Sequence, residues 1–287
     1  MKDIAIVVDS SSGLTKEQAN KLGLYFLPLQ IELEGQIYND GIDLTYDNFF
    51  NHFSLNTKVA KTSATNLGYA SDLLTSLANE YQKVVVFPIS SKLSSQFSML
   101  DSIAKDLNNV YIVDSVDIAV TILVRVQKFI NDYQKLGFEE AFKNACVWNE
   151  DELSITLLPK FNDYLVRGGR LSPAANIIAK LLKVVPLIKF SNGILDKEGK
   201  GRVFDKSLIN VVDSKIKNKE DKLIFLGEKN EDMFSLIEYV KKQYNIEPIV
   251  LPIPNVISIH TGPQAIVIIK TNTEIKDLIA KYVSEII

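Results

Sequence analysis

The sequence predicts an α/β protein of two domains: a parallel-sheet domain over residues 1–150 and an α+β domain with a mixed sheet over residues 151–287. Two observations support this fold class. In the first half, short apolar segments alternate with helical patterns, which is typical of parallel strands joined by crossover helices. After the polar segment at residues 146–154 this alternation gives way to several strands with fewer helices between them. The length of 287 residues also exceeds the roughly 100–200 residues of one domain.

Three apolar segments of the N-terminal domain are predicted to be buried strands, and each ends in hydroxyl-bearing or acidic residues. They are "IAIVVDSSS" at 4–12, "KVVVFPISS" at 83–91 and "VYIVDSV" at 110–116. In a parallel sheet, ligands bind beyond the carboxyl ends of the strands. The sequence therefore predicts one polar rim formed by Ser10–Ser12, Ser90–Ser95 and Asp114–Ser115.

Helical patterns lie between and after these strands. The segment "LTKEQANKLG" begins with a capping-box pair, Thr15 and Gln18, and "LGYASDLLTSLANEY" is a second helical pattern. A third helix, in "VDIAVTILVRVQKFINDYQKLG", is expected to stop at Gly137.

The C-terminal domain is expected to begin with a helix, a glycine turn and a second helix that starts near Pro173. A strand pair turning at residues 191–193 follows, and then helices near 204–217 and 231–244. The remaining strands are predicted in "KLIFLGE", "EPIVLPI", "VISIHT" and "AIVIIKT". A final helix is expected after a capping box of Thr271 and Glu274.

Composition and charge exclude several classes of protein. With 46% apolar residues, 23% charged residues and a net charge of -3, the chain is typical of a soluble globular protein and shows no basic excess for nucleic acid. The single cysteine, Cys146, excludes an intramolecular disulfide. The start of the chain lacks a signal peptide, and no apolar run approaches the roughly 18 residues of a spanning helix. A cytoplasmic location without stable membrane insertion is therefore predicted.

Motifs for phosphate, metal or nucleophile sites are weak or missing in this sequence. The serine-rich stretch "VVVFPISSKLSSQFSML" contains no glycine to cradle a phosphate, and no GxSxG motif occurs. Only His52 and His260 could serve as histidine ligands, and neither has a second histidine at helical spacing, so no metal site is predicted. Ser94, Asp114 and His260 could still form a triad, because triads are defined by geometry.

Several polar residues have both a structural and a functional interpretation. His260 is predicted at the end of an apolar strand, where it could serve a site or be a core histidine bonded to a carbonyl. The segment "VAKTSATN" carries more hydroxyls than helix capping requires. Arg170, in "RGGRLS", could be solvated or could pair with an anion. The basic "DKEGKGRVF" segment is interpreted as a hairpin tip.

Five motifs together resemble the DegV family. They are "KTSATN", "ISSKLSSQFSM", "YLVRGGRLS", "LLKVVPLIKFSNGIL" and "ISIHTGPQAIVI". Their order and spacing agree over essentially the whole chain, from "VDSSSGL" to the terminal helix. The resemblance implies two α/β domains that hold one long-chain fatty acid between them, with the carboxyl group bound by hydroxyls and the tail buried.

The resemblance also implies a non-catalytic role, with the fatty acid as ligand and no cofactor. Such proteins resemble the binding subunit of a bacterial fatty acid kinase. That subunit presents the acid to a separate ATP-using subunit, which makes acyl-phosphate for phospholipid synthesis. The implied partners are therefore the fatty acid, a kinase subunit and at most a transiently contacted membrane.

Matching by motif position carries the family's ligand-binding residues over to this chain. They would be Thr62, Ser63, Ser94, Ser95, His260 and Thr261. Thr62 and Ser94 would bind the carboxylate, and His260 would complete the polar end. Arg202, which lies where the family has a basic segment, would dock the kinase or meet the phosphoryl group, unless it is a solvated turn residue. Arg170 is a further candidate for partner or head-group contact.

A fatty acid places two physical demands on its carrier. A buried carboxylate needs several donors, and each charge-assisted hydrogen bond contributes roughly 1.5–3 kcal/mol. Burial of about 14 methylenes at about 0.8 kcal/mol each contributes on the order of 11 kcal/mol, which a membrane also offers. A carrier must therefore enclose the tail in an apolar tunnel, and the apolar "ANIIAKLLKVVPLI" permits such a tunnel or a core.

The sequence departs from the family pattern at several positions. It has Ala64-Thr65-Asn66 where many relatives have Gln-Pro-Ser, and Ser95-Gln96 where they have Gly-Thr. The segment "IAVTILV" replaces glycines that often follow the Asp-Ser pair, and Gln264 stands where glycine is usual.

Two alternatives to a carrier remain: a serine hydrolase of acyl esters using Ser94, Asp114 and His260, and a module for another small anion such as a phosphorylated metabolite.

Overall fold

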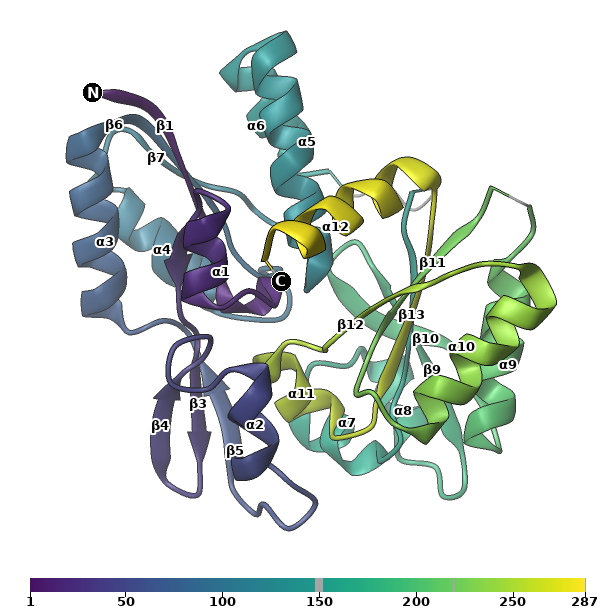
Figure 1. The fold of residues 1–287 in the computed structure, drawn as a ribbon. Coiled ribbons are helices and arrows are strands. Elements are labelled where there is room, and N and C mark those ends of the chain that lie inside the picture. The colour runs from purple at the N-terminus through teal and green to yellow at the C-terminus, as the bar shows by residue number, and fades with distance from the viewer. Residues whose placement is uncertain (148–151, 219, 287) are drawn as a thin grey trace. The chain divides into compact units, whose positions relative to one another are not determined.

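The computed structural model describes residues 1–147, 152–218 and 220–286, which fold into two compact units (Figure 1). The first unit comprises Met1–Trp148, Pro254–Val256 and Tyr282–Ile287, and the second comprises Asn149–Ile253 and Ile257–Lys281. The predicted domain boundary, between residues 150 and 151, lies outside the described residues and stays a prediction.

The first unit is built on a four-stranded parallel sheet, which confirms the predicted fold class. Its strand order is β2-β1-β6-β7, formed by Tyr25–Leu27, Lys2–Asp9, Tyr81–Phe87 and Val110–Ile112. All three neighbouring pairs are parallel. The three apolar segments predicted as strands form β1, β6 and β7, whereas β2 has only three residues and was not predicted.

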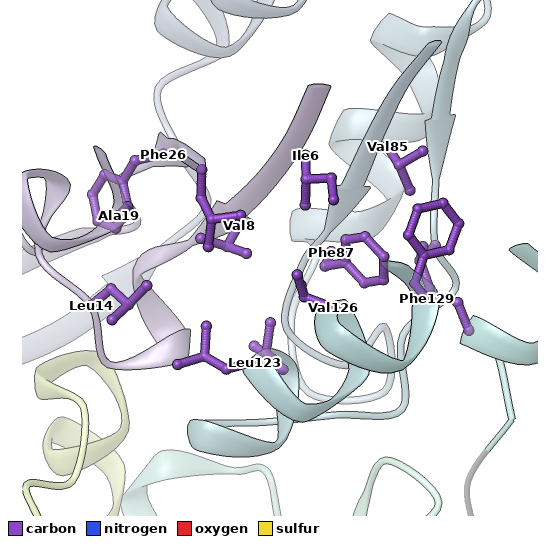
Figure 2. Packing of buried hydrophobic residues seen from close by; sticks show 14 of the residues in the cluster. Ile6, Val8, Leu14, Ala19, Phe26, Val85, Phe87, Leu123, Val126 and Phe129 are labelled. Carbon is purple, nitrogen blue, oxygen red and sulfur yellow. The ribbon is translucent and has the colours of Figure 1, made fainter. Parts of the chain in front are cut away.

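Both faces of this sheet are buried, because alternate residues of β1 and β6 enter different cores. Ile6, Val8, Val85 and Phe87 pack in one core with residues of α5 (Val120–Leu136), as Figure 2 shows. Helices α1 (Lys16–Lys21) and α6 (Phe138–Ala145) contribute to the same core. Ala5, Val7, Val84 and Val86 face the other core, with α3 (Leu67–Glu80) and α4 (Gln96–Ala104). This two-sided burial explains the continuous apolar runs of the strands.

A small antiparallel sheet, which the sequence did not predict, lies within the same unit. Its order is β4-β3-β5, formed by Gln36–Asn39, Gln30–Leu33 and Ala60–Ser63. Helix α2 (Tyr46–His52) lies between β4 and β5 in the chain and ends at the exposed His52. Strand β5 carries the candidate residues Thr62 and Ser63.

The second unit contains the predicted mixed sheet. Its strand order is β10-β9-β8-β13-β11-β12, formed by Ile194–Gly201, Val185–Ser191, Ser154–Leu158, Ile266–Thr271, Lys222–Leu226 and Ile249–Leu251. Only the β11–β12 pair is parallel, and the other pairs are antiparallel. Helices α9 (Phe204–Lys215) and α10 (Glu231–Tyr244) pack their apolar side chains on the sheet in one core. The remaining helices are α7 (Asn162–Gly168), α8 (Pro173–Ala179), α11 (Asn255–Thr261) and α12 (Thr273–Ile286).

Several local predictions are confirmed. The capping box of Thr15 and Gln18 forms at the start of α1. Helix α5 ends before Gly137, whose φ of 85° is easily adopted only by glycine. The strand pair β9–β10 turns at Asn192 and Gly193, which both have positive φ as a two-residue hairpin turn requires. Helix α8 begins at Pro173, as predicted.

Three local predictions are wrong. The segment "VISIHT" is the helix α11 and not a strand, because a short apolar run is compatible with both structures. The "GKG" glycines lie in β10 and not at a hairpin tip. A Cβ atom at Gly201 would clash with Ser207 Oγ, so the packing of β10 against α9 requires a glycine at this position. Helix α12 is capped by Asn272, whose Oδ1 accepts from Ile275 N at 2.9 Å, and not by Thr271.

Within the described residues, no helix is long and apolar enough to cross a membrane.

Candidate functional site

The polar ends of the parallel strands lie next to one another in the first unit, as the sequence predicts. Ile89 N, beyond β6, donates to the Asp9 carboxylate at the end of β1 at 2.8 Å. Ser91 N donates to Ser115 O beyond β7 at 3.3 Å. Ser91 Oγ donates to Asp114 Oδ1 at 2.6 Å. The three strand ends therefore form one connected polar rim.

Most serines of this rim have structural roles. Ser11 N donates to Asp9 Oδ1 at 3.0 Å, and Ser12 Oγ donates to Asp9 O at 2.7 Å. Ser10 Oγ accepts from Leu29 N at 3.1 Å, and Ser10–Ser12 are all buried. Ser90 is buried too, and its Oγ accepts from Lys92 N. These hydroxyls satisfy backbone and carboxylate groups where the strands end.

Ser94 and Ser95 differ from these serines because they are more accessible and lie at the start of α4. Ser94 is half-buried, and its Oγ accepts a hydrogen bond from Gln96 N at 3.2 Å. Ser95 is exposed and is the N-cap residue of the helix. A serine hydroxyl that accepts can also donate its own proton. The positive end of the helix dipole favours an anion at the same place.

Thr62 and Ser63 point to opposite faces of the small sheet, because they are consecutive residues of β5. Thr62 is half-buried and pairs with the buried Ile31, whereas Ser63 is exposed and pairs with Gln30. Ser63 Oγ lies 3.5 Å from Gln30 Oε1. The pleat of β5 therefore directs the two hydroxyls away from each other, so they do not both point to one small group.

A buried side-chain pair joins the two hydroxyl-bearing segments of the first unit. Thr65 N donates to Gln96 Oε1 at 2.9 Å, and Gln96 Nε2 donates to Thr65 Oγ1 at 2.8 Å. Thr65 is 4% exposed and Gln96 is 0% exposed. The sequence singled out Gln96 only as a departure from the family pattern, and its pairing with Thr65 over 31 positions was missed.

His260 and Thr261 lie in the second unit, in the last turn of α11. Burial, together with the nearby Arg170 charge, lowers the pKa of the half-buried His260 from 6.5 to about 4. The imidazole is therefore neutral near pH 7, and a neutral imidazole donates one hydrogen bond and accepts another. Thr261 is buried, and its Oγ1 lies 3.5 Å from Gly262 O.

Gly168, the last residue of α7, allows the close approach of His260. A Cβ atom at this position would lie 3.0 Å from His260 Nδ1 and 3.3 Å from its Cβ. Arg170 Nη1 donates to Gly168 O at 2.6 Å, although Arg170 is an exposed residue. Arg202 is exposed in the segment between β10 and α9. Arg170 therefore belongs to the surroundings of His260.

The candidate residues are divided between the two units. Thr62, Ser63, Ser94 and Ser95 belong to the first unit, and His260, Thr261, Arg170 and Arg202 belong to the second. Within the first unit, the Thr65–Gln96 pair joins the segment of Thr62 to that of Ser94. In the second unit, Gly168 lies against His260, and the charge of Arg170 lies near enough to lower the pKa of His260.

The geometry of Asp114 offers no support for a catalytic triad, because its carboxylate accepts from Ser91. Over residues 1–147, 152–218 and 220–286, no cluster of three or more histidine, cysteine, aspartate or glutamate side chains could hold a metal ion.

Comparison with known proteins identifies relatives over the full length of the chain. A family model described as "Uncharacterised protein, DegV family" matches residues 3–271. A DegV domain-containing protein of Mycoplasmopsis pulmonis is 45% identical over 287 residues, which cover 97% of this chain and 99% of the relative.

Solved structures have the same fold. A structure described as DegV, a fatty acid binding protein from Bacillus subtilis, has a TM-score of 0.79 at 22% identity and covers 95% of this chain and 100% of its own. A stearic acid-binding protein from Eubacterium ventriosum has a TM-score of 0.77 at 23% identity and covers 99% of this chain and 100% of its own. Because the family model spans most of the sequence, the chain belongs to the DegV family.

Proposed function

We propose that this protein is a non-catalytic cytoplasmic carrier that binds one long-chain fatty acid and presents its carboxylate to a separate kinase subunit. Family membership and the fatty-acid-binding proteins among its structural neighbours support the ligand class. The observation that carries the proposal is the joining of the Thr62 and Ser94 segments through the buried Thr65–Gln96 pair.

The head group of this ligand is an ionised carboxylate, which accepts hydrogen bonds and donates none. We assign its main donors to the hydroxyls of Thr62 and Ser94. Ser94 Oγ accepts from Gln96 N, so its own proton is the one it offers to a carboxylate. The adjacent N-terminus of α4 adds a favourable partial charge. Hydroxyl donors bind the anion without a counter-ion that would compete with later phosphorylation.

His260 is assigned to the polar end as a neutral donor, with Thr261 near it. Its lowered pKa, about 4, keeps the imidazole uncharged at the pH at which a fatty acid is ionised. A neutral group avoids the desolvation cost of a second buried charge. Ser63 and Ser95 are assigned to the margin of the site because both are exposed.

Delivery of the ligand would require a kinase subunit and brief contact with a membrane. Ile177 is 67% exposed, Leu181 42% and Leu182 91%, and the exposed Lys180 and Lys183 lie beside them. Apolar side chains next to lysines suit the surface of an anionic bilayer.

Arg202 and Arg170 are assigned to the kinase or to the phosphoryl group, since both are exposed. The kinase partner is tested by isolating a tagged form of the protein from an extract of its host and assaying the isolated material for ATP-dependent acyl-phosphate synthesis. Absence of this activity would contradict the proposed kinase subunit.

The ligand is tested first by denaturing extraction of the purified protein and mass spectrometry. We expect about one long-chain fatty acid per chain, or its uptake when stearic acid is added to delipidated protein. Thr62→Ala and Ser94→Ala should each weaken stearic acid binding about tenfold, because each removes one charge-assisted hydrogen bond. Titration calorimetry on the delipidated proteins provides the dissociation constants.

Ser63→Ala is the matched control, because it deletes an exposed hydroxyl from the opposite face of the same strand. We expect it to change the dissociation constant less than Thr62→Ala does. Absence of bound fatty acid together with failure to take one up would overturn the carrier. Hydrolysis of an acyl ester that Ser94→Ala abolishes would indicate a hydrolase instead.

A further inference from the structure

Gln96 makes three hydrogen bonds that reach both hydroxyl-bearing segments of the first unit. Its backbone N donates to Ser94 Oγ at 3.2 Å. Its side-chain Oε1 accepts from Thr65 N at 2.9 Å, and its Nε2 donates to Thr65 Oγ1 at 2.8 Å. Gln96 is 0% exposed, and its two side-chain bonds to the buried Thr65 are shielded from water.

The orientation of the Gln96 amide follows from its partners. Thr65 N can only donate, so the oxygen of the amide must face it, and the NH₂ group then meets Thr65 Oγ1. If the Gln96 amide were rotated by half a turn, its Nε2 would face Thr65 N, and both of these groups are donors. Because leaving a buried polar group unpaired is costly, the amide is held in one orientation.

These contacts fix the hydroxyl segments relative to each other. Thr65 follows Thr62 by three residues at the end of β5, and Ser94 precedes Gln96 by two residues at the start of α4. The parallel strands and the small sheet support the two segments separately, since β5 pairs with β3 and α4 packs in the core beside β6. The Thr65–Gln96 pair is a direct side-chain link between the segments.

We propose that Gln96 is a positioning residue that holds the Thr62 and Ser94 hydroxyls at the spacing of one carboxylate, and thereby sets the preference for an ionised head group over a neutral one. This inference rests on the proposed fatty acid binding. Hydrogen bonds weaken steeply when distance and angle depart from their optimum. Loss of the link therefore reduces the advantage of a charged acceptor and leaves burial of the tail unchanged.

The test compares two ligands with the same tail, stearic acid and octadecan-1-ol, on delipidated protein. For Gln96→Ala we expect stearic acid to bind about tenfold more weakly, because the loss of alignment costs about one charge-assisted hydrogen bond. Octadecan-1-ol should bind the variant and the unchanged protein equally. Thr65→Val, which keeps the backbone donor and removes the hydroxyl, should give a smaller change in the same direction.

Two control variants separate positioning from stability. Asn109→Ala removes the side-chain amide of a half-buried residue in the same unit, whose Nδ2 donates to Ala78 O at 2.9 Å and to Tyr81 O at 2.8 Å. It should lower the thermal midpoint and leave both ligand affinities unchanged. Thr65→Ser retains the hydroxyl and should restore the acid preference that Thr65→Val loses.

The outcomes are distinguishable. If the unchanged protein fails to bind stearic acid, the proposed function itself is wrong. If it binds stearic acid and Gln96→Ala weakens both ligands equally, or neither, the positioning role is overturned. If Gln96→Ala does not fold, Thr65→Val and Thr65→Ser decide the question by the same comparison.

Discussion

The charge of one histidine is set by its surroundings in the second unit. His260 lies against Gly168 and near Arg170, and both burial and the arginine charge disfavour its protonated form. A glycine at position 168 is needed for this packing, because a Cβ atom there would lie only 3.0 Å from His260 Nδ1. The pKa of His260, which the sequence placed in a strand, therefore depends on its burial and on another segment of the chain, residues 168–170.

We predict that His260 titrates with a pKa of about 4 in the ligand-free protein. Its pKa is below that of the unfolded chain, so this group adds stability as the pH rises from about 4 to 6.5. Proton NMR of the imidazole signals across this range measures the value. His52→Gln assigns the two histidines, because only these two occur in the chain.

Replacing Arg170 tests the second cause of this shift. Arg170→Gln should raise the pKa of His260 modestly, because burial remains the larger cause. An imidazole that titrates near 6.5 in the unchanged protein would show that His260 is solvated and not packed as described.

Two departures from the family pattern share one backbone property. Ala119 has φ 53° and Gln264 has φ 59°, a left-handed region in which residues with a Cβ atom are strained. The sequence analysis placed Gln264 where glycine is usual in the family, and Ala119 lies in the segment "IAVTILV", which replaces glycines of the family pattern. This chain therefore adopts a positive φ at both positions without a glycine.

At the scale of elements, the start of α5 carries this strain. Ala119 has φ 53° and ψ −142°, a conformation normally confined to glycine, directly before Val120 begins the helix. We predict that Ala119→Gly raises the free energy of unfolding by about 1 kcal/mol, since strain of this kind costs about 1–3 kcal/mol. Urea denaturation at pH 7 measures the change.

Ala70→Gly is the control for this prediction, because Ala70 is buried in the interior of α3. There a glycine has no strain to relieve and should destabilise the protein by about 1 kcal/mol or more. Equal destabilisation by both substitutions would contradict the strained conformation of Ala119.

Helix α11 shows why its type was predicted wrongly. Its seven residues are too few for a helical period to be distinguished from a buried strand. The element begins at the buried Asn255, whose Nδ2 donates to Asp40 Oδ1 at 3.0 Å and to Leu44 O at 3.3 Å. These partners are more than 200 positions away, so no local pattern could reveal them.

At the scale of the whole molecule, two buried carboxyl groups couple stability to pH. Burial raises the pKa of Asp40 to about 7 and that of Asp9 to about 6. The negative charge of Asp9 adds to the effect at Asp40. Hydrogen bonds from Asn255 and Ser10 oppose it but do not compensate for the loss of water.

We predict that Asp40 makes the protein less stable as the pH rises from about 4 to about 7. The folded chain binds the Asp40 proton more tightly than the unfolded chain does. The stabilisation that this proton provides is therefore complete below pH 3.8, and it is lost as the pH rises to the pKa of the folded chain, about 7. Relative to Asp40→Asn, the unchanged protein should therefore lose several kcal/mol of stability over this range. Urea denaturation of both proteins at a series of pH values measures the difference.

Asn255→Ala provides a second comparison, because it removes a donor to the ionised carboxylate and leaves the acid in place. It should steepen the loss of stability with pH. A difference between the unchanged protein and Asp40→Asn that does not vary with pH would exclude Asp40 as a titrating group.

The sequence by itself determined the elements that have long or strongly patterned segments. The runs of β1, β6 and β7, the capping box at Thr15 and the hairpin at Asn192 and Gly193 are local, because each depends on residues close together in the chain. These patterns gave the α/β class and the hydroxyl-rich strand ends. The three-residue β2 and the four-residue strands β3, β4 and β5 were missed, whereas β7, also three residues long, was predicted because it lies in the longer apolar segment "VYIVDSV".

Only the tertiary structure decided which hydroxyls are buried and which remain accessible. Ser10–Ser12 are buried around Asp9, whereas Ser94 and Thr62 are half-buried, although all look alike in the sequence. The pairing of Thr65 with Gln96 was likewise invisible, because 31 residues separate them. The physical reason is that burial and hydrogen-bond partners depend on segments brought together by packing, which local residue patterns do not specify.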